Sequence, residues 1–204
     1  MPTSEHTNGN VQRKQPHDNN QSGNIEMSNN CILPDIRLRA IEPEDLDILY
    51  KIENDEMLWD VGVNNIYYSR YILHEYIANA KGDIYTDRQA RLIIENNIHD
   101  VVGIVDIVDF DPKHLRAEIG IVIQNKYRHM GYAKAAISHI IKYAKNVLHL
   151  HQLYAYVNSD NTTSIKMFDN AGFTQSAELK DWLYDGSKHH NAVIMQYFIK
   201  KNRI

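Results

Sequence analysis

The spacing of hydrophobic residues predicts an alternation of strands and helices from residue 35 onward. Side chains that alternate between apolar and polar with a period of two are typical of half-buried strands. This pattern, with one run that is apolar throughout, predicts strands over residues 35–41, 91–95, 101–109, 116–123, 153–157, 174–184 and 191–200. Apolar residues with a period of about 3.6 predict helices that begin at Pro43 and at about residues 69, 133 and 161.

The order of these elements predicts one α/β (α+β) domain over residues 34–204. The run from Val101 to Val105 is apolar throughout, which is typical of a central strand covered on both faces. Asp185 and Gly186 lie between the last two strands and predict a tight turn. Residues 1–33 are rich in Asn, Gln, Ser and His and contain few large apolar side chains, so we expect a disordered tail there.

Composition narrows the possible partners of the protein. With 204 residues, a formal net charge of −4 and a pI of about 6.2, the chain lacks the basic excess of a dedicated nucleic-acid binder. Its single cysteine, Cys31, excludes an intramolecular disulfide bond. No stretch reaches the roughly 20 apolar residues that span a bilayer, and the N-terminus lacks the apolar core of a signal peptide. We therefore expect a cytoplasmic protein with no nucleic-acid partner, no membrane partner and no metal site.

The segment between the strand at 116–123 and the following helix contains the most informative motif. A strand enters it and an amphipathic helix leaves it, so that successive backbone N–H groups converge where an anion can bind. Gly131 permits close approach of the backbone, Ala133 is small, and Arg128 can add a charged contact. The sequence here matches neither a P-loop nor a dinucleotide-binding fingerprint. Taken alone, the motif also fits an ordinary strand-to-helix turn.

Arg128-x-x-Gly131-x-Ala133 resembles the pyrophosphate-binding motif of the GNAT superfamily of N-acetyltransferases. Residues 161–173 resemble the second signature of that superfamily, and the similarity extends over about residues 35–200. Within the superfamily the chain looks most similar to bacterial spermidine/spermine N-acetyltransferases. That likeness rests on residues 84–87, 105–109 and 114–119. Ribosomal-protein N-terminal acetyltransferases and aminoglycoside acetyltransferases share much of the same layout.

The resemblance implies a mixed, mostly antiparallel sheet flanked by helices, with central strands that splay apart. Acetyl-CoA would be the co-substrate, and its pantetheine arm would lie in the gap between those strands. The residues that the resemblance places beside the coenzyme are Ile121, Val122, Ile123, Arg128, His129, Met130, Gly131, Tyr132, Ala133, Asn161 and Phe168. Asn161 could instead be a helix N-cap, and both roles are compatible. The resemblance also implies a small-molecule amine substrate and a homo-oligomer.

An amine attacks a thioester only in its neutral form, and keeping an amine with a pKa near 10.4 neutral at pH 7 costs about 4–5 kcal/mol. A nearby carboxylate base would help. Glu118 is the first candidate, because a glutamate at this place is typical of polyamine acetyltransferases; its alternative role is an ion pair with Arg116. Asp109 is the second catalytic candidate, and Asp106 follows it.

One position departs from the family pattern. Many relatives carry a tyrosine in the second signature that can protonate the leaving thiolate, and this chain has Phe168 there. Phe168 could simply pack in the core, while water, Tyr156 or Tyr132 supplies the proton. The leading interpretation is acetyl transfer to a primary amine, with a polyamine such as spermidine as acceptor. The alternatives are a ribosomal-protein N-terminal acetyltransferase and a non-catalytic acetyl-CoA-binding module.

Overall fold

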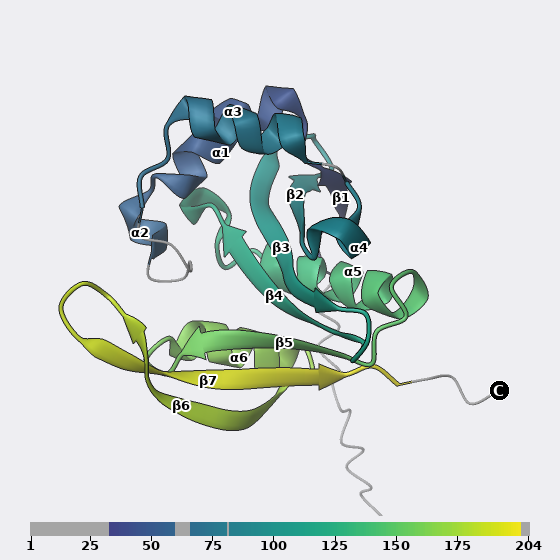
Figure 1. Ribbon diagram of the computed structural model, residues 1–204, viewed down its shortest axis with the longest axis vertical. Coiled ribbons are helices and arrows are strands. Elements are labelled where there is room, and N and C mark those ends of the chain that lie inside the picture. The colour runs from purple at the N-terminus through teal and green to yellow at the C-terminus, as the bar shows by residue number, and fades with distance from the viewer. Residues whose placement is uncertain (1–32, 60–65, 81, 201–204) are drawn as a thin grey trace, which may run out of the picture. The chain divides into compact units, whose positions relative to one another are not determined.

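A computed structural model describes residues 33–59, 66–80 and 82–200 (Figure 1), and its described residues contain a seven-stranded sheet. The order of strands across the sheet is β1-β2-β3-β4-β5-β7-β6. The strands are β1 Ile36–Ala40, β2 Ala90–Asn96, β3 Val101–Asp111, β4 Arg116–Ile123, β5 Gln152–Asn158, β6 Thr174–Tyr184 and β7 His189–Phe198. All seven predicted strands are therefore confirmed. The expected tail lies outside the described residues, apart from Leu33.

The sheet is antiparallel except between β4 and β5, which run parallel. The register between these two strands joins Arg116–Glu118 to Gln152–Tyr154 and goes no further. Beyond Glu118, β4 continues beside β3 alone, so the edge of β4 that faces β5 has no ladder partner among the described residues. The predicted mixed, mostly antiparallel sheet with splayed central strands is confirmed.

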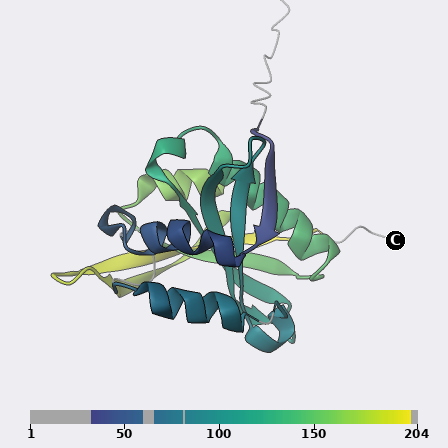
Figure 2. The ribbon, with the colours of Figure 1, turned by 90° about the horizontal axis from the view of Figure 1, so that it is seen from above.

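Helices cover the two faces of the sheet. They are η1 Pro43–Asp45, α1 Leu46–Glu53, α2 Glu56–Trp59, α3 Arg70–Asn79, α4 Ile84–Asp87, η2 Asn125–Tyr127, α5 Tyr132–Asn146 and α6 Thr162–Asn170. Helices α5 and α6 bury their apolar sides against one face, in the main core cluster with Ile119 and Phe173. On the other face, Ile52 and Leu58 from α1 and α2 pack on Ile104 in a smaller cluster. Helices α1 and α3 lie side by side above this second face (Figure 2).

The helix boundaries follow local capping chemistry. The Ser69 side chain accepts a hydrogen bond from the backbone N–H of Ile72 at 3.2 Å and starts α3. Pro43 opens a 3₁₀ turn that leads into α1, where the sequence predicts a continuous helix. Helix α5 ends at Asn146, although Leu148 beyond it is still buried. The four-residue helices α2 and α4 were not predicted, because one turn is too short to show a helical period.

An ion-pair network attaches β1 to β2 and to the η1 turn. The guanidinium of Arg39 donates two hydrogen bonds to the carboxylate of Asp45, at 2.7 and 2.8 Å, and a third to Glu95 at 2.8 Å. Asp45 and Glu95 are only 5% and 7% exposed. Asp45 therefore depends on Arg39 for charge compensation, whereas Glu95 also lies 2.8 Å from Nδ1 of His99. No helix among the described residues is long and apolar enough to cross a membrane.

Candidate active site

A cavity of about 530 Å³ lies between the α1–α3 helices and strands β2–β4. Aliphatic side chains such as Ile52, Leu73 and Val122 make up much of its wall. The ionisable residues that line it are Glu53, Tyr68, Tyr76, Arg91, Asp106, Asp109 and Glu118. Four of these side chains are carboxylic acids and one is a guanidinium, so the cavity favours a cationic ligand.

An ion-pair network around Arg91 forms part of the cavity wall. Arg91 donates to both carboxylate oxygens of Asp106, at 2.6 and 2.9 Å, and to Glu53 at 2.5 Å. The guanidinium carbon also lies 5.6 Å from the ring centre of Tyr76. Asp106, the third carboxylate that the sequence suggests, is thereby committed to an ion pair.

Glu118 lies farther along the same cavity and has a different environment. It faces the cavity from β4, between Val108 on β3 and Tyr154 on β5. Burial, and then the nearby negative charge of Asp109, raise the pKa of Glu118 to about 7. Within the described residues Glu118 forms no ion pair, and Arg116 lies 3.6 Å from Asp111 instead. The alternative of a Glu118–Arg116 ion pair is therefore wrong.

Asp109 reaches the cavity because β3 is irregular at this point. The register between β3 and β4 shifts between Val108 and Asp111, and Asp109 has a φ of 47°, in the left-handed region. An irregularity of this kind redirects a side chain that would otherwise follow the alternation of the strand. The irregularity therefore places the two carboxylic acids that the sequence suggests, Glu118 and Asp109, on the wall of one cavity.

The predicted anion-binding loop leads from β4 into α5. Gly131 has a φ of 87° and is the N-cap of α5, while His129 (φ 63°) and Met130 are exposed. The first N–H groups of α5, which begins at Tyr132, have no partner within the helix. Gly131 is half-buried, so the turn is open to solvent, and a Cβ added there would lie 3.1 Å from Cδ of Pro34. The loop therefore fits a diphosphate.

Arg128 holds this loop against the end of β4. Its Nε donates a hydrogen bond to the backbone carbonyl of Ile123 at 3.1 Å. Ile121 and Val122 are half-buried along the edge of β4 that β5 leaves unpaired, whereas Ile123 is buried. This edge offers free backbone groups for the amides of a pantetheine arm. The residues present therefore fit the pantetheine arm and the diphosphate of acetyl-CoA.

The two candidate residues in the second signature have clear structural roles. Oδ1 of Asn161 accepts a hydrogen bond from the backbone N–H of Ser164 at 3.0 Å, so the N-cap role is confirmed. Phe168 is 5% exposed and packs edge-on against Phe173, with ring centres 5.0 Å apart, so the core role is also confirmed. Contact of either residue with the coenzyme remains a prediction.

Sequence reasoning missed two aromatic residues near the carboxylates. Tyr154 is the neighbour of Glu118 across β4 and β5, and burial, with the charges of Asp109 and Glu118, raises the pKa of Tyr154 to about 12. Trp182 of β6 stacks on Tyr156, with ring centres 6.0 Å apart and planes at 28°. A row of tyrosines at alternate positions of β5 is visible in the sequence, but its proximity to Glu118 depends on a strand register that the sequence does not reveal.

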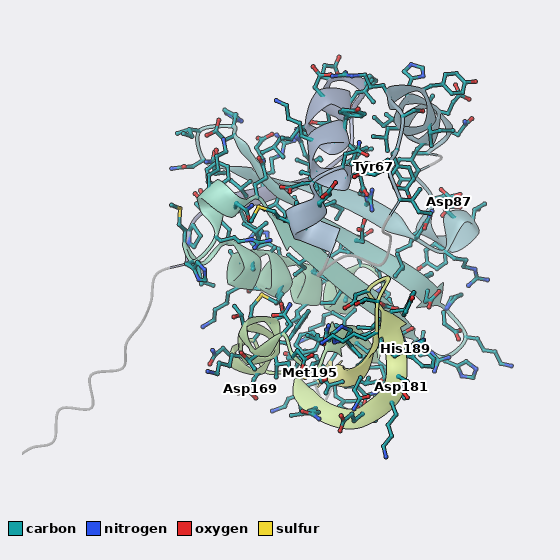
Figure 3. The ribbon with its side chains drawn as sticks, turned by 90° about the vertical axis from the view of Figure 1, so that its left-hand side faces the viewer. Tyr67, Asp87, Asp169, Asp181, His189 and Met195 are labelled. Atoms are coloured by element: carbon teal, nitrogen blue, oxygen red, sulfur yellow. The ribbon has the colours of Figure 1, made fainter. Side chains whose placement is uncertain are left out.

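The carboxylic acids of the cavity and the stacked aromatic residue Trp182 lie in different halves of the sheet, one formed by β1–β4 and the other by β5–β7. Figure 3 shows Asp87 and Tyr67 with the helices that flank the β1–β4 half, and Asp181 and His189 on the β6–β7 hairpin of the other half. Glu118 belongs to the first half and Trp182 to the second. The cavity with Glu118 therefore lies on one side of the point at which β4 and β5 diverge, and the aromatic residues of β5 and β6 lie on the other side.

The fold agrees with comparisons to known proteins. Residues 35–174 match the acetyltransferase (GNAT) domain family. The spermidine N(1)-acetyltransferase of Escherichia coli K12 is 26% identical over 163 residues, which cover 80% of this chain and 86% of that protein. The corresponding enzyme of Vibrio cholerae is 22% identical over 156 residues, which cover 76% of this chain and 88% of that protein.

Solved structures give the same result for the fold. The crystal structure of spermidine N-acetyltransferase from Vibrio cholerae in complex with CoA and spermine matches with a TM-score of 0.75 and 21% identity. The match covers 80% of this chain and 95% of that one. A dodecameric structure of the Vibrio cholerae enzyme matches with a TM-score of 0.69 and 22% identity, over 80% and 93% of the two chains.

The chain belongs to the GNAT acetyltransferase family, since the family match covers most of its length. It is a GNAT N-acetyltransferase family enzyme related to the spermidine N-acetyltransferases.

Proposed function

We propose that this protein transfers the acetyl group of acetyl-CoA to a primary amine, and that the acceptor is a polyamine such as spermidine. The observation that carries this proposal is the position of Glu118. Its carboxyl is half-buried, has a pKa raised to about 7, and lies on an acidic cavity where β4 leaves β5. A base with a pKa near the working pH is the most effective proton acceptor.

The proposed role of Glu118 is to receive the proton that the acceptor must lose. A primary ammonium with a pKa near 10.4 is almost fully protonated at pH 7, and its deprotonation costs about 4–5 kcal/mol there. The Glu118 carboxylate accepts that proton, directly or through one water molecule, and the neutral amine becomes nucleophilic. That proton passes to solvent when the product leaves. The second proton, which the nitrogen loses after it attacks the thioester carbon, passes through water to the departing thiolate and gives the free thiol of CoA. The negative charge of Asp109 keeps the pKa of Glu118 raised and attracts the ammonium.

The residues proposed to hold acetyl-CoA are those of the β4 edge and the following loop. The backbone N–H groups at the start of α5, with Gly131 and Arg128, would bind the diphosphate. Ile121 and Val122 would lie beside the pantetheine arm. When bound, acetyl-CoA supplies the activated acyl group as a thioester, whose thiol has a pKa near 8.5 and leaves readily.

Charge supports a polycation as the acceptor. The carboxylic acids that line the cavity outnumber its one guanidinium, Arg91, so the cavity is a poor site for an anion. Two relatives with 22% and 26% identity acetylate spermidine according to their names. We also propose that the chain forms a homo-oligomer, as the Vibrio cholerae enzyme does in its dodecameric structure; mass photometry of the purified protein tests this.

The experiment is a thiol-release assay with acetyl-CoA and a panel of amines. The panel contains spermidine, spermine, aminoglycosides and basic N-terminal peptides. Thiol release should be fastest with a polyamine, and mass spectrometry should find one added acetyl group on it. Faster release with the peptides would overturn the polyamine proposal, and no release with any amine, despite coenzyme binding, would overturn the enzymatic proposal.

A further inference from the structure

We propose that the stacked pair Tyr156–Trp182 binds a second, non-reacting cationic group of the acceptor, while Glu118 and Asp109 hold the amine that reacts. This inference rests on the proposed function, because it requires an acceptor with more than one positive charge. It adds a specificity-determining subsite on the β5–β6 side of the opening, opposite the cavity.

Strand geometry puts this aromatic pair in line with the carboxylates. Glu118 and Tyr154 are direct neighbours on parallel strands, and side chains of such neighbours point to the same face of the sheet. Tyr156 follows Tyr154 by two residues and therefore shares that face, about 7 Å farther along the strand. The rings of Tyr154 and Tyr156 meet edge to face with centres 5.7 Å apart, and Trp182 stacks on Tyr156.

The side chains of Tyr156 and Trp182 are more exposed than those of a buried core pair. Tyr156 is 37% exposed and Trp182 is 56% exposed, although they stack on each other. Strand β4 leaves β5 directly after Glu118, so no side chain of β4 pairs opposite Tyr156. Each ring therefore has surface open to solvent, on the same face of the sheet as Glu118.

The row of aromatic rings formed by Tyr154, Tyr156 and Trp182 favours binding of a cation. The face of an indole or phenol ring carries negative electrostatic potential and attracts an ammonium within about 6 Å of its centre. The negative charges of Asp109 and Glu118 add to that potential and already raise the pKa of Tyr154, which lies between the two groups. An acceptor with two ammonium groups joined by a short methylene chain can lie along the row, with its methylenes against Tyr154. An acceptor with one charge can occupy only the carboxylate end.

The test compares two acceptors in four variants. Trp182→Leu and Tyr156→Leu remove the aromatic faces, and Tyr184→Leu is the matched control, since Tyr184 is an equally exposed aromatic residue of β6 whose ring packs against His189. With spermidine, kcat/KM should fall about 5- to 30-fold in the first two variants, mainly through KM. With a single-charge alkylamine of the same length, kcat/KM of Trp182→Leu should change less than about twofold, and Tyr184→Leu should affect neither substrate. Trp182→Phe should restore most of the loss.

A binding measurement separates this inference from the proposed function. The chain has two tryptophans, so a Trp59→Phe background leaves Trp182 as the only indole. Spermidine should change the fluorescence of Trp182 without acetyl-CoA, and the alkylamine should not. If wild-type enzyme acetylates no polyamine, the proposed function fails. If wild-type enzyme acetylates spermidine, three outcomes would contradict the aromatic subsite. The leucine variants of Trp182 and Tyr156 could lose activity equally with both acceptors, keep full activity with spermidine, or lose activity because an oligomer dissociates.

Discussion

Replacement of Glu118 by glutamine tests the chemistry at the centre of the site. The substitution keeps the size and hydrogen-bonding capacity of the side chain but removes its ability to accept a proton. Contributions of a positioned general base are typically about 100- to 10,000-fold, so Glu118→Gln should lower kcat by about that factor. Binding of acetyl-CoA, measured by calorimetry, should not change. Glu44→Gln, the same change at an exposed position in η1, is the control for the loss of one negative charge.

The pH profile gives a second reading of the same carboxyl. Wild-type kcat/KM should rise with pH as Glu118 loses its proton and should reach half of this rise near its pKa of about 7. Asp109→Asn removes the smaller of the two causes of the raised pKa, so the midpoint should move to lower pH, while burial keeps the pKa above 4.5. The ionisation of the acceptor is the same in both enzymes, so the difference between their profiles reports the carboxyl.

Stability gives a third reading, with a definite sign. Because the pKa of Glu118 is higher in the folded protein than its ordinary 4.5, the folded state binds more protons than the unfolded state between pH 4.5 and about 7. The free energy of unfolding therefore falls across this range as pH rises. A fully buried group would contribute roughly 3 kcal/mol, which we discount to roughly 1–2 kcal/mol for a partly exposed side chain. Glu118→Gln should thus be more stable than wild type at pH 8 and equal to it at pH 4.

These three measurements can refute the argument separately. A variant that keeps wild-type kcat would show that Glu118 is not the base. If Glu118→Gln loses activity but shows no gain in stability at pH 8, burial does not raise the pKa of the Glu118 carboxyl. If Asp109→Asn leaves the midpoint unchanged, the two carboxyl groups do not interact.

Two further substitutions test the loop and the β1 network. Gly131→Ala should weaken acetyl-CoA binding at least about tenfold, because a Cβ there sits at positive φ beside the proposed diphosphate site and 3.1 Å from Pro34. Gly186→Ala, at a similar φ of 95° with nothing within 4 Å, should leave binding unchanged in calorimetry. Arg39→Met should lower the free energy of unfolding by about 3–5 kcal/mol in a denaturant titration, since it leaves the buried Asp45 without an ion pair and Glu95 with His99 alone. Arg70→Met, whose ion pair is exposed, should cost less than about 1 kcal/mol.

Much of the fold follows from patterns that the sequence displays directly. Strand β4 has the bounds that its alternation predicts, Arg116 to Ile123, because one face packs under α5 and the other faces the helices α1–α3. Helix α3 begins after Ser69 because a serine hydroxyl can satisfy a free N–H group. The loop before α5 was predictable from Gly131, since few other residues adopt its φ.

The site was less predictable, because it depends on contacts between distant segments. Nothing near Glu118 in the sequence indicates that Arg116 would turn toward Asp111, or that the irregularity in β3 would bring Asp109 to the same cavity. The stacking of Trp182 on Tyr156 joins strands that are separated by β7 in the sheet. Such placements depend on strand register and side-chain rotation, which short-range patterns do not determine.

The unpaired edge of β4 is the feature that connects these separate parts. Backbone N–H and C=O groups in a sheet almost always find partners, so a strand that loses its neighbour in mid-sheet needs another source of hydrogen bonds. From Ile119 onward the edge of β4 that faces β5 has no strand partner among the described residues. The strand leads directly into the loop with Gly131 and Arg128, which is the proposed anion-binding site. An extended ligand with amides at one end and a diphosphate at the other satisfies both requirements. Because β4 and β5 diverge immediately beyond Glu118, the gap in which we propose that the coenzyme binds begins next to the carboxyl that we propose as the base.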